Sequence, residues 1–256
     1  MSTPDVLLVT CRALPEGEPG AAVLDEALAA RGITASWVAW DDDAVDWAGS
    51  LVAVRAAWDY DARREEFLAW ARSVPRLLNS AAIFAWNTDK AYLAALAEAG
   101  APVVPTYVVE GAAVVKPRVG AGGRGVQVLD SVVVQPLVES IRTEGEYSVY
   151  VLGGEVVSMA VKRPAAGEIR VHEQYGGRTV ALPVTEEAAA VARSAVRAAE
   201  QLLGERLDYA RVDQLRLADG TLAVSELEVT EPGLYLEEIP GNGPAFAALV
   251  AALLGR

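Results

Sequence analysis

The sequence contains few of the side chains that bind transition metals or form disulfide bonds. Its 256 residues include one cysteine, Cys11, and one histidine, His172. A single cysteine cannot form an internal disulfide, and such usage is typical of a reducing compartment. Two ligands of these types are also too few for an ordinary zinc site. We therefore expect a cytoplasmic protein that uses neither disulfides nor structural zinc.

Positive charge and long apolar segments are scarce as well. The formal net charge is −13 at pH 7, which argues against a nucleic-acid partner because phosphate backbones attract basic surfaces. No apolar run reaches the roughly 18 residues of a membrane span, and residues 1–5 lack the basic start of a signal peptide. We expect small molecules as partners and no membrane association. The oligomeric state is left open, with a homodimer as one alternative.

Lysine is rare among the basic residues. Lys90, Lys116 and Lys162 are the only lysines among 22 basic side chains, and the others are arginine. On a solvated face arginine replaces lysine freely, whereas a compact ammonium group suits phosphate oxygens. The three lysines are therefore candidate phosphate ligands. The alternative is that these three positions kept lysine by chance.

The pattern of apolar runs divides the chain into three parts, of which the first is residues 1–78. Here short apolar runs alternate with helical segments, which predicts a small α/β lobe with a parallel sheet. The expected strands are 5–10, 36–39 and 51–54, and the expected helices are 23–31 and 63–72.

The second and third parts are residues 79–138 and 139–256. The second has an expected helix at 88–99, followed by short strands at 103–104, 106–109, 113–117 and 126–136. The third has a predicted hairpin around Gly153-Gly154, an amphipathic helix at 186–203, strands at 209–217 and 222–229, and a helix over the last twelve residues.

The glycine cluster Gly120-Ala121-Gly122-Gly123-Arg124-Gly125 is a candidate phosphate-binding loop. A dinucleotide-binding loop opens a helix, but the strand-like residues 126–129 follow here. A Walker A loop would end in Gly-Lys-Ser/Thr, and a protein kinase places its lysine after the loop, whereas Lys116 precedes it. A strand-loop-strand remains, whose backbone N–H groups can approach phosphate because no Cβ intervenes. An ordinary glycine-rich hairpin is the alternative.

Acidic residues lie on both sides of Asp219-Gly220, a favoured two-residue hairpin turn. Counting outward from this turn pairs Asp213 with Glu226, Arg211 with Glu228, and Leu215 with Val224. Residues two apart on a strand share a face, so three carboxylates would crowd together there.

Three carboxylates so close repel one another, and Arg211 neutralises only one of them. Hard oxygen ligands indicate magnesium or manganese, so Asp213, Glu226 and Glu228 are candidate metal ligands. A solvated polar face with a salt bridge is the alternative. A three-residue loop would change the pairing.

Taken in order, these motifs resemble the ATP-grasp superfamily over residues 79–240. The resemblance rests on Asn87-Thr88-Asp89-Lys90, Val114-Val115-Lys116-Pro117 with the glycine loop, Gln135-Pro136-Leu137-Val138, Gly145-Glu146-Tyr147-Ser148-Val149, Arg211-x-Asp213 and Glu226-x-Glu228. Residues 54–60 and 66–70 look like the preceding lobe of bacterial ATP-grasp proteins related to the D-cycloserine-forming ligase and prokaryotic glutathione synthetase. The resemblance implies an α/β (α+β) ATP-grasp fold, with the lobe at 1–78 before two α+β subdomains, 79–138 and 139–256, that clasp ATP.

The resemblance also implies roles for nucleotide and metal ligands. ATP phosphates would be bound by Lys90, Lys116, Gly120, Gly122, Gly123 and Gly125. Adenine would contact Gln135, Leu137 and Val138, and ribose would contact Glu146. Two magnesium (or manganese) ions would be held by Asp213, Glu226 and Glu228, and the transferring phosphoryl group would be steadied by Lys162 and Arg211. Glu228 stands where many relatives have asparagine, and only residues 126–134 connect the loop to Gln135, so this subdomain is shorter than usual.

The implied activity is an ATP-dependent ligase that activates a small, amino-acid-like carboxylate as an acylphosphate for attack by an amine. Arginine forks suit carboxylates, so candidate substrate residues are Arg12, Arg55, Arg163 and Arg170, with Trp58, Asp59 and Tyr235. Residues 164–177 are a candidate loop over the acceptor. The alternatives are a ring-closing ligase of the D-cycloserine type, a kinase with a stable acceptor, and a nucleotide-binding module without catalysis.

Overall fold

The N-terminal lobe is built on a three-stranded parallel sheet. The computed structural model describes residues 3–119 and 121–256, and the sheet has the order β2 (Ala35–Ala39), β1 (Val6–Thr10), β3 (Leu51–Ala56). β1 and β3 are buried along their whole length, because α1 (Ala21–Ala29) contributes to the core on one face and α2 (Arg64–Ser73) to that on the other. The expected parallel sheet is confirmed.

Two helices, rather than one, follow the lobe. The helix α3 (Ala81–Asn87) lies outside the predicted elements, and α4 (Tyr92–Glu98) begins later than the predicted helix at 88–99. Thr88 ends α3, since its hydroxyl donates to the carbonyl of Phe84. The Asp89 carboxylate then accepts a hydrogen bond from the N–H of Ala91. Such bonds to nearby backbone compete with a continuous helix.

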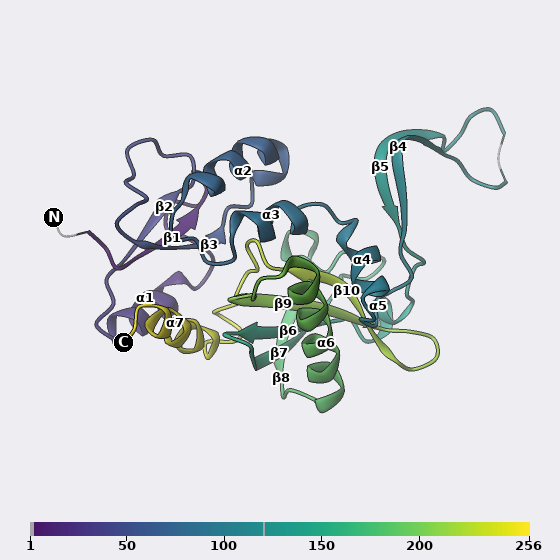
Figure 1. Cartoon of the computed structure of the whole chain (residues 1–256). Coiled ribbons are helices and arrows are strands. Elements are labelled where there is room, and N and C mark those ends of the chain that lie inside the picture. Colours follow the sequence, from purple (N-terminus) through teal and green to yellow (C-terminus); the bar gives the residue numbers. More distant parts are fainter. Residues whose placement is uncertain (1–2, 120) are drawn as a thin grey trace.

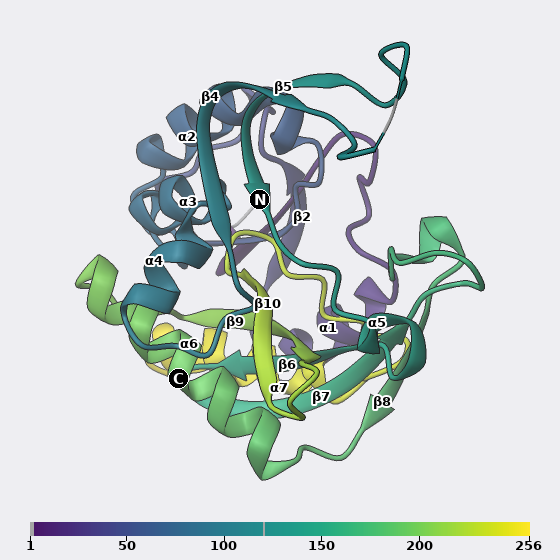
Figure 2. The ribbon, with the colours of Figure 1, turned by 90° about the vertical axis from the view of Figure 1, so that its right-hand side faces the viewer.

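A two-stranded antiparallel ribbon extends from the body of the molecule (Figure 1). Its strands are β4 (Tyr107–Val115) and β5 (Gln127–Val134), and within the described residues each pairs only with the other. β4 is one irregular strand where the sequence predicted several, and Val103 instead forms an isolated bridge to Val224 of the large sheet. The turned view shows the ribbon rising beside β10 (Figure 2).

A five-stranded antiparallel sheet forms the rest of the fold. Its order is β10 (Leu222–Glu228), β9 (Tyr209–Arg216), β6 (Glu146–Leu152), β7 (Glu155–Arg163), β8 (Arg178–Leu182), and the single turn α5 (Ser140–Thr143) precedes β6. The hairpin at Gly153-Gly154 is confirmed, and α6 (Glu186–Leu203) has the predicted bounds. Its alanine-rich face is buried on the sheet, since small side chains allow a helix to approach closely.

Beyond the bridge of Val103 to Val224, side chains cover the outer edge of β10. The Asn87 amide donates to the carbonyl of Leu227 at 2.7 Å and accepts from the N–H of Val229 at 3.1 Å. The Tyr92 hydroxyl donates to the carbonyl of Leu227 at 2.9 Å and accepts from its N–H at 2.8 Å. Buried backbone groups require such partners, so Asn87 and Tyr92 fix the strand that carries Glu226 and Glu228.

The hydrophobic core crosses the boundary expected at residue 78. Each sheet falls within one of the three expected parts, yet one apolar cluster joins Leu28 of α1 to Tyr150 of β6 and Phe246 of α7 (Asn242–Leu253). The helix α7 packs on α1, and Arg256 pairs with Asp5 near the two ends of the chain (Figure 1). The described part of the chain contains no helix that could cross a membrane.

Candidate active site

A cavity of about 640 Å³ lies between the N-terminal lobe and the large sheet. The lobe contributes Glu18 and Trp58, and the loop between β7 and β8 contributes residues 169–175. The sheet contributes most of the charged lining, namely Glu146, Lys162, Arg211, Asp213, Glu226 and Glu228, and the segment after β10 adds Glu231, Gly233 and Tyr235. Residues that are far apart in the sequence therefore meet at one polar site.

The β9–β10 hairpin brings the predicted carboxylates together by an unexpected route. Ala218-Asp219-Gly220 form a three-residue loop, closed by a 2.8 Å hydrogen bond from the N–H of Leu217 to the carbonyl of Thr221. Leu215 consequently pairs with Ala223 and not with Val224. The predicted two-residue turn is therefore wrong.

A β-bulge at Ser225 restores the predicted pairing where it matters. Beyond the bulge Asp213 pairs with Glu226 and Arg211 with Glu228, as the sequence predicted. A slip of one residue moves every side chain to the other face of a sheet. Without the bulge, the three-residue loop would therefore turn Glu226 and Glu228 away from Asp213.

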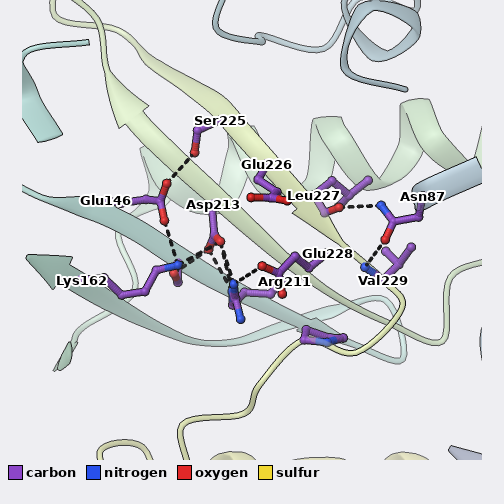
Figure 3. A network of polar contacts seen from close by, with 12 residues as sticks. Asn87, Glu146, Lys162, Arg211, Asp213, Ser225, Glu226, Leu227, Glu228 and Val229 are labelled. Atoms are coloured by element: carbon purple, nitrogen blue, oxygen red, sulfur yellow. Dashed lines mark hydrogen bonds and ion pairs between the residues drawn. The ribbon is translucent and has the colours of Figure 1, made fainter. Parts of the chain in front are cut away.

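Charged side chains from the four neighbouring strands β10, β9, β6 and β7 form a buried network on this face (Figure 3). Lys162 Nζ lies 2.8 Å from Glu146 and 3.0 Å from Asp213. Arg211 donates from Nε and Nη2 to Asp213 at 3.0 and 2.9 Å, and it also pairs with Glu228. The side chains of Lys162, Arg211 and Asp213 are 4%, 7% and 2% exposed.

Mutual attraction keeps Asp213, Lys162 and Arg211 of this network ionised. Burial opposes the ionisation of Asp213, but Arg211 and Lys162 hold its pKa well below the usual range. Burial and the nearby Arg211 also disfavour a charged lysine, yet Asp213 and Glu146 raise the pKa of Lys162 overall. Lys162 and Arg211 are therefore cationic at physiological pH, as a site that stabilises phosphoryl oxygens requires.

An acidic group of three glutamates adjoins the network. Glu226, Glu228 and Glu231 line a second cavity of about 200 Å³, where Lys90 pairs with Glu226. Burial raises the pKa of Glu228 to about 7, and repulsion from Asp213 and Glu226 adds to the effect. Burial likewise raises the pKa of Glu231 to about 8, with repulsion from Glu228. The folded protein therefore holds these carboxylates close together although their negative charges repel one another.

The carboxylates fit magnesium by their chemistry but do not form a ready-made cluster. Among the residues that the structure describes, no three histidine, cysteine, aspartate or glutamate side chains converge closely enough to hold a metal ion. Glu226 and Glu228 pair with Lys90 and Arg211 instead, and the metal-binding role of the three carboxylates stays a prediction. Magnesium prefers such oxygen ligands, and a divalent cation would relieve the repulsion that raises the pKa of Glu228.

The predicted nucleotide ligands are divided between the cavities and the rest of the chain. Glu146 and Lys162 line the larger cavity, and Lys90 lines the smaller one. Lys116, Gly122, Gly123 and Gly125 lie beyond the paired strands of the ribbon and line neither cavity, and Gly120 lies outside the described residues. Gln135, Leu137 and Val138 also line neither cavity, and the Gln135 amide donates to Thr106 Oγ1 at 3.0 Å. Their contacts with ATP stay predictions.

The predicted substrate residues are only partly at the cavity. Trp58, Arg170 and Tyr235 line it, and the Arg170 guanidinium lies 3.7 Å from the centre of the Tyr175 ring in the expected loop. The others line neither cavity, which corrects the prediction for Arg12, Arg55, Asp59 and Arg163. Arg12 pairs with Asp41, Asp59 accepts a hydrogen bond from Trp40, Arg163 faces solvent, and Arg55 is fully buried.

Glu18 and Glu231 are among the residues at the cavity that were not predicted. Each lies next to proline in a segment rich in glycine and proline, where a charged residue is most often an exposed turn residue. Both are held at the cavity by the lobe: Glu18 by Arg55 and Glu231 by a hydrogen bond with Tyr60. Only these distant partners distinguish them, so the local sequence carries no signal for either.

The comparison with solved structures and protein families identifies the class. The fold matches the crystal structure of D-cycloserine synthetase DcsG with a TM-score of 0.81 and 30% identity, over 97% of this chain and 99% of that one. It also matches the ATP-grasp ligase PsnB in complex with a minimal precursor, Mg and ADP, with a TM-score of 0.58 and 19% identity, over 98% of each chain. The chain is an ATP-grasp ligase, an ATP-dependent enzyme that forms C–N bonds.

Sequence comparisons assign the chain to a particular family of ATP-grasp ligases. Residues 6–79 match the family model of the D-cycloserine synthetase DcsG N-terminal domain. The cycloserine biosynthesis protein DcsG of Streptomyces lavendulae is 32% identical over 275 aligned residues, which cover 90% of this chain and 92% of that protein. The chain therefore belongs to the DcsG family.

Proposed function

We propose that this ligase activates the carboxylate of a small, amino-acid-like molecule as an acylphosphate and joins it to an amine, with ATP and magnesium. The proposal is supported chiefly by the buried cations Lys162 and Arg211, which line a cavity of about 640 Å³. The carboxylates of the large sheet line the same cavity: Glu146, Asp213, Glu226 and Glu228. The volume suits a small molecule together with the tail of a nucleotide, since ligand sites span about 300–1,000 Å³.

The chemistry needs positioning and charge more than a reactive side chain. A carboxylate oxygen of the substrate attacks the γ-phosphorus of ATP, the bond to the β–γ bridging oxygen breaks, and ADP leaves. The amine then attacks the acyl carbon, phosphate leaves, and the amine loses a proton. Lys162 and Arg211 would stabilise the negative charge of the transferring phosphoryl group. Asp213, Glu226 and Glu228 would hold magnesium, which neutralises phosphate oxygens when bound.

The substrate would lie on the lobe side of the cavity. Trp58 and Tyr235 form apolar walls there, and Arg170 offers a fork for a carboxylate. The ion pair of Arg170 with Glu168 and its contact with the Tyr175 ring hold this guanidinium in place. A pre-ordered arginine loses less entropy when it binds an anion.

Intramolecular ring closure is the second candidate, because the relationship to the cycloserine biosynthesis protein extends over nearly the full length of both chains. In that reaction one molecule supplies both the acyl group and the amine. The residues and the acylphosphate step are the same, so the cavity alone does not distinguish the two.

The test is ADP release against a panel of amino acids, their O-substituted derivatives and small amines, followed by the mass of the product. Ligation yields a product with the combined mass of both substrates less one water. Ring closure yields the mass of a single substrate less one water. A stable phosphorylated product, or no ADP release despite ATP binding, would contradict the proposal.

A further inference from the structure

One wall of the cavity is formed by a segment that belongs to no strand. Residues 230–235 follow β10, and buried residues alternate there with residues that line the cavity. Glu231, Gly233 and Tyr235 line the cavity, whereas Pro232 and Leu234 are buried. Buried backbone groups require hydrogen-bond partners, and strand pairing does not supply them here.

Glu18 and Arg55 are the partners of this backbone. Arg55 Nη2 donates to the carbonyl of Pro232 at 2.6 Å, and Glu18 Oε2 accepts from the N–H of Leu234 at 2.7 Å. The two side chains are also bound to each other, since Arg55 Nε and Nη2 donate to Glu18 Oε1 at 3.0 and 2.9 Å. The pair thus grips the segment at two points on either side of Gly233.

The burial of this ion pair is difficult to explain as a source of stability. The side chains of Arg55 and Glu18 are 0% and 2% exposed, and the guanidinium lies 4.8 Å from the centre of the Phe246 ring. Removing two charges from water costs free energy, and an apolar pair of similar volume is often as stable. The ion pair instead fixes the position of the backbone at Pro232 and Leu234.

The gripped segment is close to the catalytic network. The Arg211 guanidinium lies 5.8 Å from the centre of the Tyr235 ring, and Tyr235 has a φ of +50°. This backbone conformation is uncommon for a bulky residue and persists only when its surroundings enforce it. Leu234, the preceding residue, is the one whose N–H is bound by Glu18.

We propose that Glu18 and Arg55 are positioning residues that hold the 231–235 segment, and so align the acid substrate with the phosphoryl group. The inference rests on the proposed function, because it assumes that the substrate contacts this segment. Although Glu18 lines the cavity, both of its oxygens are engaged, so neither side chain acts on the reacting atoms.

The test replaces both charges at similar volume with the double variant E18M/R55M, which leaves the backbone of Pro232 and Leu234 without its partners. We expect the KM for the acid substrate to rise at least about tenfold, because a displacement of 1 Å can reduce rates by more than that. The KM for ATP should change less than about twofold. Hydrogen exchange should accelerate at residues 231–235, while β6 and β9 stay protected.

The control is D208A, which weakens a contact between distant segments that does not involve residues 231–235. Asp208 accepts a hydrogen bond from the N–H of Asn79 at 2.9 Å and lines neither cavity. We expect a lower unfolding temperature in this variant, with both KM values and the exchange of residues 231–235 unchanged. A role of Glu18 and Arg55 in stability alone would make the two variants behave alike.

A second variant, E18Q, keeps an oxygen that can accept from Leu234 and should show a smaller rise in KM. An unchanged KM for the acid in both E18Q and a folded E18M/R55M would overturn the inference. If the wild-type enzyme makes no product with any acid, the proposed function fails. The exchange measurement still decides the inference in that case, since equal rates at residues 231–235 in E18M/R55M and the wild type would contradict it.

Discussion

Single side chains in the two cavities are organised as pairs of opposite charge. Asp213 is shared between Lys162 and Arg211, whereas Glu226 pairs with Lys90. The surroundings of the two acidic residues differ, because Asp213 is 2% exposed and Glu226 is 34% exposed. Removing Asp213 takes one carboxylate partner from each of two buried cations, and removing Glu226 leaves a solvated lysine.

Replacement of these two residues should therefore separate activity from stability. We expect E226Q to lower ADP release about a hundredfold, a size typical of lost electrostatic stabilisation, with little change in unfolding temperature. D213A should lose activity and also about 3–5 kcal/mol of stability, because it uncovers buried charge. Thermal unfolding and an ADP-release assay measure both effects.

Ser225 provides a matched control beside Glu226. Its hydroxyl donates to Glu146 at 3.0 Å, and it is the bulged residue of β10. We expect S225A to change activity less than about tenfold, since one hydrogen bond typically contributes about 1 kcal/mol and Glu146 keeps its ion pair with Lys162. Full activity in E226Q would contradict the role proposed for the acidic group.

Among the individual elements, the β9–β10 hairpin determines whether the site exists. Its three-residue loop and the bulge at Ser225 each shift the ladder by one residue, and the two shifts compensate. Gly220 has a φ of +88°, which such a loop favours at its last position. The loop lies at the end of the hairpin, and the bulge lies beside the carboxylates.

Deletion of Ala218 tests whether the loop or the bulge sets the pairing of the carboxylates. The remaining Asp219-Gly220 would form a favoured two-residue turn and keep the pairing of Leu217 with Thr221. We expect ADP release within about twofold of the wild type and an equal or higher unfolding temperature, because the shorter turn orders fewer residues. A loss of activity like that of E226Q would show that the turn, and not the bulge, holds the register.

The complete chain consists of a body with a continuous core and a ribbon that projects from it. The lobe, the large sheet and α7 share apolar clusters, so the cavity lies between rigidly joined parts. β4 and β5 contribute no residue to these clusters. The chain is acidic, with a formal net charge of −13. Three of its glutamates, Glu226, Glu228 and Glu231, meet at the smaller cavity.

This acidic group should make the stability of the protein depend on pH and on magnesium. The folded pKa values of Glu228 and Glu231, about 7 and about 8, lie above the ordinary value of 4.5, so the folded protein binds more protons than the unfolded chain. The free energy of unfolding should therefore fall as pH rises from about 5 to about 8. Magnesium with ADP should oppose the fall, because the ion binds the deprotonated carboxylates.

Thermal unfolding at pH 6 and pH 8.5, with and without magnesium and ADP, measures this dependence. E231Q is the control, since a neutral side chain at this position should flatten the pH response without magnesium. An unfolding temperature that rises with pH in the absence of magnesium would contradict the assignment of these raised pKa values.

Short-range patterns in the chain were enough for much of the fold and the centre of the site. The bounds of α6 and the two alternating strands that carry Asp213 and Glu226 follow from periodicity. The ATP-grasp class follows from motifs in order, because catalysis by charge needs lysines and carboxylates of defined types. Such features depend on neighbours along the chain, so the sequence carries them directly.

Packing between distant segments determined the features of the fold and the site that the sequence did not predict. Arg55 became a buried support because Glu18 and Pro232, from both ends of the chain, meet it in space. The loop and bulge of the hairpin, and the break between α3 and α4, likewise depend on which backbone and side-chain partners are present. The free energy of a buried charge or an unpaired backbone group is set by these partners, and no local pattern of residues encodes them.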